Sequence, residues 1–551
     1  MTGQAVAIPE DALVFVPLGG SDEIGMNMNL FHAAGSWLVV DCGVNFAGEG
    51  LPGIDLLMPD PGFIAARREK IAALVLTHGH EDHVGAVVHL WPQLGCPIYA
   101  TPFTAELVRG KFEEAGLRDA PLHVVEVGGS FAAGPFAVRY VPLAHSIPEG
   151  HGLLIETPLG RIFHTGDWKL DHAPQIGRPS TPEALKAIGD AGVRAMIGDS
   201  TNVFQPRASG SEQAVRESLM DLLHLYEEGR VVITTFASNL ARLKTIAAVA
   251  RHHGRRLVIA GRALERVIAA GRATGYLDDW PETVPIEDAG HLPRRELLIL
   301  CTGAQGEPRA ALSRMARGEH AHLELEAGDV VIFSAKIIPG NELAVARVAN
   351  QLARRDVEVV TEREAFVHVS GHPGREELRE MYGWIRPEVA VPVHGEPRHL
   401  RAHARLAAEL GVPEQVIPFN GAVIQLAPGP ARILGEVPAR RLALDGRFLI
   451  PLDDPDFQLR RRIGAEGLAI VSVVLGSRLE PVVSPDIRFY GVLGVGPEEQ
   501  LELEALVTDL LDRESGNLER LAERIRIAVR RRLRTLTGKN PTVDVRITRA
   551  G

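Results

Sequence analysis

The stretch Thr77-His78-Gly79-His80-Glu81-Asp82-His83 decides the fold, and it directly follows an apolar run at residues 73–76. The run predicts a buried strand, and Gly79 allows the tight turn where that strand ends. Three imidazoles and a carboxylate this close together cannot all be core residues, because buried polar groups need partners. Mixed nitrogen and oxygen ligands suit zinc or manganese. The stretch therefore predicts a metal centre on a loop that leaves a strand.

Further candidate ligands follow other predicted strands. His145 follows the strand at residues 138–142, Asp167 follows the strand at 161–164, and His394 follows the strand at 389–393. We expect one metal to be bound by His78, His80, His145 and Asp167, and a second by Asp82, His83, Asp167 and His394. Two metals bridged in this way share a hydroxide of lowered pKa, which is the expected nucleophile on a phosphodiester.

Length and composition indicate a multidomain globular chain. The 551 residues predict two to four domains, and no run of eighteen apolar residues suggests a membrane span. Residues 1–10 lack the basic and apolar segments of a secretory signal. Cys42, Cys96 and Cys301 are far apart, which disfavours a disulfide framework or a thiolate zinc site. A reducing cytoplasm is therefore the expected compartment.

The net charge of the chain does not decide whether its partner is a nucleic acid. The formal net charge of −11 argues weakly against a nucleic-acid partner, but phosphate binding depends on local clusters of basic residues. Residues 520–534 form such a cluster, with seven arginines. It is typical either of a solvated helix face or of a surface for phosphate contact or assembly.

The order of predicted elements changes along the chain. Short strands dominate the first half, whereas from residue 231 strands and helices alternate, which predicts a parallel sheet with crossover helices. Pro and Gly are frequent at 426–440, which predicts a linker. A helix at 497–512, a basic helix at 518–535 and a strand at 543–548 then predict a small α+β domain.

Several motifs resemble those of one protein family. HGHEDH, His145, HTGDWKLD and PVHGE are similar to the metallo-β-lactamase motifs, and the insertion at about 210–366 resembles a β-CASP domain. The blocks LGGSDEIGMN, GDSTN, FASN, CTGAQGEP, FSAKIIPGN and HVSGH resemble those of the ribonuclease J family, in the same order, over about residues 12–425. The HxHxDH pattern occurs throughout the superfamily, whereas CTGAQGEP with FSAKIIPGN and HVSGH is far more specific.

The resemblance implies an α/β fold class. It places a metallo-β-lactamase αββα sandwich at residues 1–209 and 366–425, with an inserted β-CASP α/β domain at 210–365. A linker at 426–445 and a small C-terminal α+β domain at 446–551 complete the expected organisation.

The resemblance also implies residue roles. Asp199 matches a catalytic acid, His372 a proton-transferring histidine near the scissile phosphate, and His394 a third motif that is also a metal ligand. Hydroxyls, an amide and backbone N–H groups exposed by glycine are suitable donors for phosphate. The segments expected to hold RNA phosphates are Ala237, Ser238 and Asn239, together with His368, Val369, Ser370, Gly371 and His372. Ser238 and Asn239 also suit a helix N-cap before Leu240.

The implied activity is that of a cytoplasmic, metal-dependent ribonuclease. It would degrade single-stranded RNA 5′→3′ from a monophosphorylated end, cut internally as well, and act in RNA maturation and decay. The resemblance implies two divalent metals, with zinc expected first and manganese or magnesium in activity. It further implies a homodimer or homotetramer, RNA-decay or ribosome-associated partners, and no membrane.

Two alternatives remain open. One is a small-molecule hydrolase such as a lactonase or thioesterase, although small substrates need no second domain. The other is a non-catalytic RNA-binding partner, which should have lost ligands that are all present here. Two departures from the family pattern, Met26 where Lys is frequent and Pro397 where Tyr is frequent, leave the lining of the RNA path open.

Overall fold

The computed structural model describes residues 6–48, 50–177, 181–513 and 517–550. The chain divides into a larger unit, Met1–Asn45 with Met58–Arg440, and a smaller unit, Phe46–Leu57 with Arg441–Gly551. Residues 1–5, within the segment 1–10 that lacks the pattern of a secretory signal, lie outside the described residues. No helix in the described part of the chain is long and apolar enough to span a bilayer.

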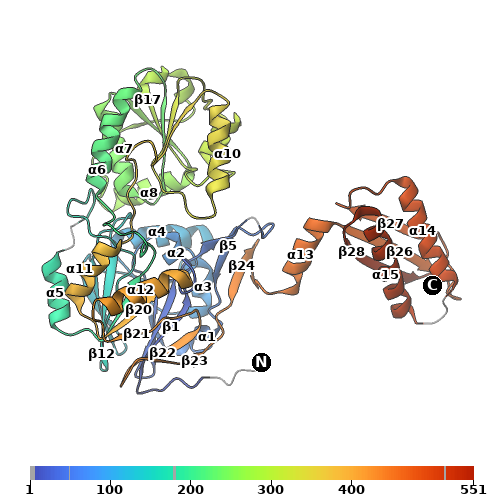
Figure 1. The fold of residues 1–551 in the computed structure, drawn as a ribbon, viewed down its shortest axis with the longest axis horizontal. Helices are drawn as coiled ribbons and strands as arrows, with labels where there is room; N and C mark the ends of the chain where they lie inside the picture. Colours follow the sequence, from blue (N-terminus) through green and yellow to red (C-terminus); the bar gives the residue numbers. More distant parts are fainter. Residues whose placement is uncertain (1–5, 49, 178–180, 514–516, 551) are drawn as a thin grey trace. The chain divides into compact units, whose positions relative to one another are not determined.

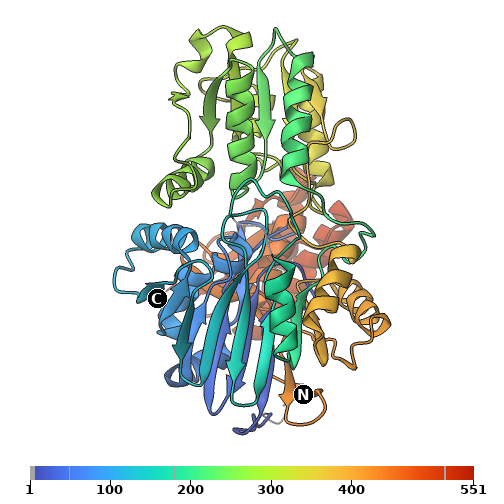
Figure 2. The ribbon, with the colours of Figure 1, turned by 90° about the vertical axis from the view of Figure 1, so that its left-hand side faces the viewer.

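Two stacked sheets form the centre of the larger unit (Figures 1 and 2). The eight-stranded sheet has the order β23-β22-β1-β2-β3-β6-β7-β8, and the seven-stranded sheet has the order β21-β20-β13-β12-β11-β10-β9. The first comprises β1 (Leu13–Gly19), β2 (Met28–Ala33), β3 (Ser36–Val40), β6 (Ile71–Val75), β7 (Ile98–Ala100), β8 (Leu122–Val124), β22 (Ala422–Ala427) and β23 (Arg432–Glu436). The second comprises β9 (Ser130–Ala133), β10 (Phe136–Pro142), β11 (His151–Thr157), β12 (Gly160–His164), β13 (Ala195–Asp199), β20 (Val389–Val393) and β21 (Glu414–Gln415).

One apolar core joins the two sheets. Phe15 and Val40 from the first sheet pack in the same cluster as Tyr140, Ile155 and Val391 from the second. Strand β10 alternates buried and exposed residues over most of its length, as expected of a strand with one face on a core. Helices lie on the outer sides: α3 (Val87–Leu94), α4 (Pro102–Ala115), α5 (Pro182–Asp190), α11 (Arg375–Ile385) and α12 (Pro397–Glu409). This arrangement confirms the predicted αββα sandwich.

The insertion forms a separate sheet within the larger unit, with the order β16-β15-β17-β14-β18-β19. Its strands pair in parallel, which confirms the parallel sheet with crossover helices that was predicted from residue 231 onward. Its strands are β14 (Val231–Thr234), β15 (Arg256–Ala260), β16 (Thr283–Val284), β17 (Leu297–Cys301), β18 (Val330–Phe333) and β19 (Glu358–Val360). Separate apolar clusters cover its two faces, through α6 (Glu212–Leu222), α7 (Leu240–His252) and α8 (Arg262–Ala273) on one and α9 (Ala311–Arg317) and α10 (Glu342–Ala353) on the other.

The smaller unit contains an α+β core, as predicted. The sheet β27-β26-β28 packs one face on α14 and α15, and a further sheet has the order β25-β24-β5-β4. The elements are β4 (Asn45–Phe46), β5 (Leu56–Pro59), β24 (Arg441–Asp445), β25 (Phe448–Pro451), α13 (Pro455–Glu466), β26 (Leu468–Leu475), β27 (Asp486–Tyr490), α14 (Pro497–Asp512), α15 (Leu518–Thr537) and β28 (Thr542–Arg549).

The predicted linker at residues 426–445 is largely strand. Strand β23 pairs with β22, and β24 pairs with β25, so the Pro and Gly residues of this stretch separate strands that are hydrogen-bonded to neighbours. Gly429 has φ of 75°, which suits the turn between β22 and β23. The domain limits themselves stay predictions.

Candidate metal centre

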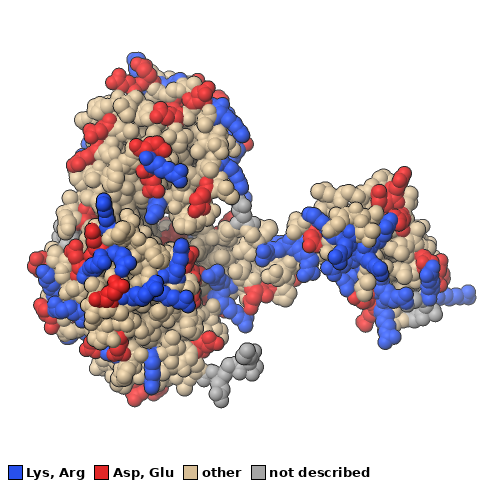
Figure 3. Space-filling view, viewed as in Figure 1, with Lys and Arg blue, Asp and Glu red and all other residues tan. Residues whose placement is uncertain are grey.

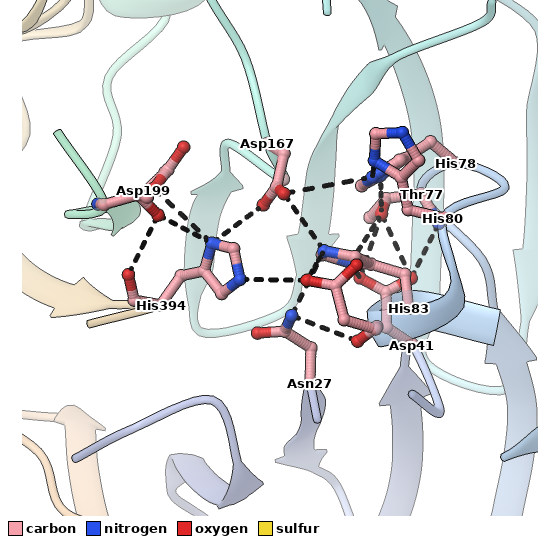
Figure 4. A network of polar contacts seen from close by, with 12 residues as sticks. Asn27, Asp41, Thr77, His78, His80, His83, Asp167, Asp199 and His394 are labelled. Carbon is pink, nitrogen blue, oxygen red and sulfur yellow. Dashed lines mark hydrogen bonds and ion pairs between the residues drawn. The ribbon is translucent and has the colours of Figure 1, made fainter. Parts of the chain in front are cut away.

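The seven predicted ligands come from four separate places in the fold. His78 and His80 lie on the loop after β6, and Asp82 and His83 lie in the short helix α2 (Glu81–Val84) that follows it. His145, Asp167 and His394 follow β10, β12 and β20 of the other sheet. The structure brings all seven side chains together (Figure 4 labels His78, His80, His83, Asp167 and His394).

The first predicted ligand group is tight enough to bind one ion. Nδ1 of His80 lies 3.1 Å from Nε2 of His78 and 3.0 Å from Nε2 of His145. Oδ2 of Asp167 lies 3.9 Å from Nε2 of both His78 and His145. Ligands about 2.0–2.1 Å from a tetrahedral zinc lie about 3.3 Å from one another. The donor set and its spacing therefore fit a divalent metal.

The second group shares Asp167 with the first. Nε2 of His83 lies 3.2 Å from Oδ2 of Asp167 and 3.6 Å from Oδ2 of Asp82. His394 lies between two carboxylates, because its Nε2 is 3.2 Å from Oδ2 of Asp82 and its Nδ1 is 3.2 Å from Oδ1 of Asp167. Asp167 therefore has the position of a ligand common to both groups.

Hydrogen bonds behind the ligands orient them. Nδ1 of His83 donates to Oδ2 of Asp41 at 2.7 Å, and Nδ1 of His145 donates to the carbonyl of Gly371 at 2.7 Å. Each bond leaves Nε2 of the same ring directed at the cluster, which is how metal-binding histidines are commonly oriented. Asp41 also accepts from the backbone N–H of Thr77 at 2.8 Å.

Sequence reasoning missed Asp41 and Asn27. Asn27 donates from its amide to the carbonyl of Asp82 at 3.1 Å, and Figure 4 shows both Asn27 and Asp41 beside the cluster. A signal for Asp41 was available, since it is a polar residue directly after the buried strand β3, as His394 directly follows β20.

Electrostatics divide the cluster into neutral and charged imidazoles. Burial and the neighbouring imidazoles hold the pKa of His78 and of His145 well below the usual histidine value, so both are neutral. Burial also opposes charge on His394, but the carboxylates of Asp167 and Asp199 outweigh it and raise its pKa to about 10. The carboxylates therefore favour positive charge between them, which a divalent cation would satisfy.

Asp199 and His372 form a pair beside the second group. Nδ1 of His372 donates to Oδ2 of Asp199 at 2.8 Å, and Oδ1 of Asp199 accepts from the backbone N–H of Thr201 at 2.9 Å. Burial opposes charge on His372, but Asp199 and Asp167 outweigh it and raise its pKa. Both oxygens of Asp199 are thus engaged as acceptors, so the carboxylate orients the ring of His372.

The segment at residues 368–372 lies against the cluster. Oγ of Ser370 accepts from the amide of Asn202 at 2.7 Å and from the backbone N–H of His372 at 3.2 Å. Nδ1 of His368 is buried and has no hydrogen-bond partner among the described residues. Burial lowers the pKa of His368 to about 3, with further lowering by Arg242 and Lys336. This segment therefore holds an imidazole nitrogen without a described partner in a positive field.

The segment at residues 237–239 lies at the start of α7. Oδ1 of Asn239 accepts from the backbone N–H of Arg242 at 3.0 Å, which confirms the predicted N-cap for Asn239. Ala237 and Ser238 are half-buried in the turn before it. The side chain of Asn239 is therefore engaged within the protein, whereas this N-cap does not use Ser238.

Glu377 connects three segments around the centre, and sequence reasoning missed it. Its buried carboxylate accepts from the backbone N–H groups of Leu170 at 2.8 Å, Ser209 at 2.8 Å and Gly374 at 2.7 Å, and from Oγ of Ser209 at 2.8 Å. These segments follow Asp167, lead into the inserted domain and follow His372, so one side chain ties their backbones together.

Comparison with known families defines the class of protein. Residues 36–194 match the beta-lactamase superfamily domain, residues 228–352 the beta-CASP domain of ribonuclease J, and residues 356–418 the Zn-dependent metallo-hydrolase RNA specificity domain. Together with the sandwich fold and the His and Asp cluster, these matches define a metallo-β-lactamase hydrolase with a β-CASP insertion, a class of metal-dependent nucleases.

Curated relatives identify the family. The chain is 40% identical to ribonuclease J of Sinorhizobium meliloti, over 98% of this chain and 98% of the relative. It is 36% identical to ribonuclease J of Thermus thermophilus, over 97% and 95%, and 35% identical to ribonuclease J 1 of Streptococcus pyogenes, over 94% and 90%. The chain belongs to the ribonuclease J family, which confirms the resemblance seen in the motifs.

A solved structure shares the fold. A protein of unknown function from Enterococcus faecalis aligns with a TM-score of 0.52 at 16% identity, over 75% of this chain and 100% of that one. At this identity the likeness concerns the fold alone.

Proposed function

We propose that the chain hydrolyses phosphodiester bonds of single-stranded RNA at a centre of two divalent metals. The observation that carries this proposal is the convergence of two ligand groups that share Asp167, with the His372–Asp199 pair beside them. The names of the relatives support RNA as the substrate. Zinc is the metal proposed first, and manganese or magnesium can serve in activity.

We assign separate roles to the residues of the centre, namely metal binding and proton transfer. His78, His80, His145 and Asp167 would hold one metal, and Asp82, His83, Asp167 and His394 the other. When bound, the metals supply Lewis-acid chemistry, which lowers the pKa of water and offsets negative charge on the phosphodiester. Because Nδ1 of His372 donates to Asp199, its Nε2 is the atom that delivers a proton to the leaving oxygen.

We further propose that the chain degrades RNA 5′→3′ and prefers a 5′-monophosphate. Ser238, His368 and Ser370 would hold the terminal phosphate, and the free Nδ1 of His368 in a positive field supports this assignment. Hydrogen bonds to such a charged acceptor are each worth about 1.5–3 kcal/mol. A triphosphate adds charge and bulk that this set of donors does not match.

Other features belong to the same proposal. The backbone N–H groups of Ala237, Val369 and Gly371 would support the RNA phosphates, and long RNA would also be cut internally. Family membership supports four further parts of the proposal. They are a role in RNA maturation and decay, a cytoplasmic location, assembly as a homodimer or homotetramer, and RNA-decay or ribosome-associated partners.

The test compares two substrates that differ only at the 5′ end. The purified chain should degrade 5′-monophosphate RNA at least about tenfold faster than 5′-triphosphate RNA, a difference of about 1.4 kcal/mol. A chelator should abolish both reactions, and added zinc or manganese should restore them. Equal rates on both substrates would contradict the 5′ preference, and full activity in chelator would contradict the metal mechanism.

A further inference from the structure

Helix α15 has a row of exposed side chains along one side. The row comprises Arg520, Arg524, Ile527, Arg531 and Arg534. Intervals of three and four residues place these side chains on one helix face, which is about 21 Å long at 1.5 Å per residue. The opposite face packs into the core of the smaller unit through Leu521, Ile525, Val529 and Leu533.

The end of α13 extends this surface. Nζ of Lys539, just after α15, donates to the carbonyl of Ala465 near the end of α13 at 3.0 Å. Arg461 and Arg462 are exposed on α13. Figure 3 shows Lys and Arg side chains gathered over this part of the smaller unit. We call the row on α15, with Arg461, Arg462 and Lys539, the basic face.

Most acidic residues of the smaller unit lie outside α15, which itself carries Glu519 and Glu523, the latter paired with Arg526. The smaller unit, residues 46–57 and 441–551, contains 18 Lys and Arg and 19 Asp and Glu, so its formal charge is nearly zero. The basic face therefore results from the separation of basic from acidic residues, not from an excess of basic ones. Helix α14 carries Glu498, Glu499, Glu502, Glu504, Asp509 and Asp512. Glu502 binds Arg532 at 2.6 Å, whereas Arg531 and Arg534 form no ion pair with a described residue.

We propose that the basic face binds phosphates of single-stranded RNA outside the catalytic centre. The proposal rests on the proposed function, because it takes RNA as the substrate. Guanidinium groups bind phosphate oxygens through paired N–H donors, and a row about 21 Å long can contact several phosphates of one strand. A protein partner is less favoured, since interface centres are poor in charge and the row contains a single apolar residue, Ile527.

A second RNA-binding site would raise the affinity of the chain for long RNA only. A short RNA bound at the catalytic centre occupies that site alone, whereas a long RNA can bind both sites and gains affinity from the linkage. Removing one arginine that binds a phosphate should also make the dependence of log K on log salt less steep by about 0.7 for a single strand.

The experiment uses two double variants of the full chain that remove equal charge. R531Q/R534Q alters the basic face. R488Q/R546Q alters β27 and β28, where each arginine is paired with an aspartate on its own strand at 3.1 Å. Binding is measured by fluorescence anisotropy in chelator, with RNAs of roughly 8 and 40 nucleotides and over a series of salt concentrations. Light scattering gives the mass of each variant.

R531Q/R534Q should weaken binding of the longer RNA about five- to twentyfold and flatten its salt slope by about 1.4. Binding of the shorter RNA and the control variant should change by less than about twofold. Equal losses in both variants, or none in either, would overturn the proposal. A fall in mass of R531Q/R534Q alone would assign the face to assembly instead. If the wild-type chain binds neither RNA, the proposed function itself fails.

Discussion

At the scale of single residues, backbone strain and hydrogen bonds fix the metal centre. Asp41 and His394 have φ of 63° and 54°, a left-handed conformation that residues with a Cβ rarely adopt. Such conformations persist only where the surroundings enforce them. Here the backbone N–H of His394 donates to the carbonyl of Gly20, and its ring contacts Asp82 and Asp167. The strain is therefore held in place by the contacts that build the site.

Replacing Asp41 by Asn tests whether the orienting bond to His83 matters for metal binding. The Asn side chain accepts less strongly than a carboxylate, so the ring of His83 should lose its fixed orientation. We expect metal affinity to fall about 10- to 100-fold, measured by competition with a chromophoric chelator. Asp329→Asn, a buried carboxylate of the inserted domain, is the control. Equal metal affinity of the wild type and the Asp41→Asn variant would show that the hydrogen bond from His83 to Asp41 does not contribute to metal binding.

Replacing His372 by Ala separates proton transfer from binding. The loss of a proton-transferring group should lower turnover about 10²–10⁴-fold, while the Kd for RNA in chelator changes little. Asp199→Asn should cause a smaller loss, because His372 keeps its ring but loses its carboxylate partner. A variant His372→Ala that loses RNA affinity in proportion to turnover would instead make His372 a binding residue.

At the scale of elements, the sequence pattern predicted the strands and their order better than their connections. Short apolar runs bounded by turn residues identified strands such as β10, and alternating strands and helices identified the parallel sheet of the insertion. The pairing of β1 with β22 joins Phe15 to Ile424, and no local pattern indicates a contact across such a distance in sequence. The local pattern also gave no sign that residues 432–436 form β23 and pair with β22, so the sequence predicted a linker there.

The same limit explains which site residues were found. The candidate ligands in residues 78–83 lie close enough together in sequence to suggest a metal site by themselves. Asp199 and His372 are 173 residues apart in sequence and could be paired only through the resemblance. Glu377 lies in helix α11, and its role depends on partners from segments at 170, 209 and 374 that only the fold brings together.

The hydrogen bonds of Glu377 predict a stability effect that its neighbour Glu376 should not share. Glu377→Gln turns an amide N–H₂ toward backbone donors and leaves at least one buried N–H unpaired, which should lower the free energy of unfolding by about 1–3 kcal/mol. Turnover should fall as well, because the segment that carries His372 loses a tie at Gly374. Glu376 is exposed and accepts a single bond, from Ala208 at 3.1 Å, so Glu376→Gln is the matched control.

Denaturant unfolding and turnover on RNA measure both effects. Equal free energies of unfolding of the Glu377→Gln and Glu376→Gln variants would show that the buried carboxylate is not required for stability. A stability loss with unchanged turnover would confine Glu377 to a structural role.

At the scale of the whole molecule, the smaller unit exposes apolar side chains that a monomer would leave in water. Val482 is 52% exposed, Val483 57%, Tyr490 54% and Leu493 85%. The backbone N–H of Val482 donates to the carbonyl of Val474 near the end of β26 at 2.9 Å, whereas Tyr490 of β27 pairs with Leu468 at the start of β26. Val482 and Val483 are adjacent in sequence, and neighbouring exposed apolar residues commonly mark interaction sites. This pair favours a contribution of the smaller unit to the proposed homodimer or larger assembly.

Truncation should therefore reduce the mass of the assembly. The cut belongs after Pro451 rather than at residue 441, because removal of β24 and β25 would expose the edge of β5 in the sheet β25-β24-β5-β4. Light scattering of residues 1–451 should give a mass near that of one chain, where the full chain gives a dimer or tetramer. Val482→Asp with Val483→Asp should have the same effect through the cost of burying charge, whereas Leu343→Asp, at an exposed position in the larger unit, should not. An unchanged assembly in both the truncated chain and the double variant would place the interface wholly in the larger unit.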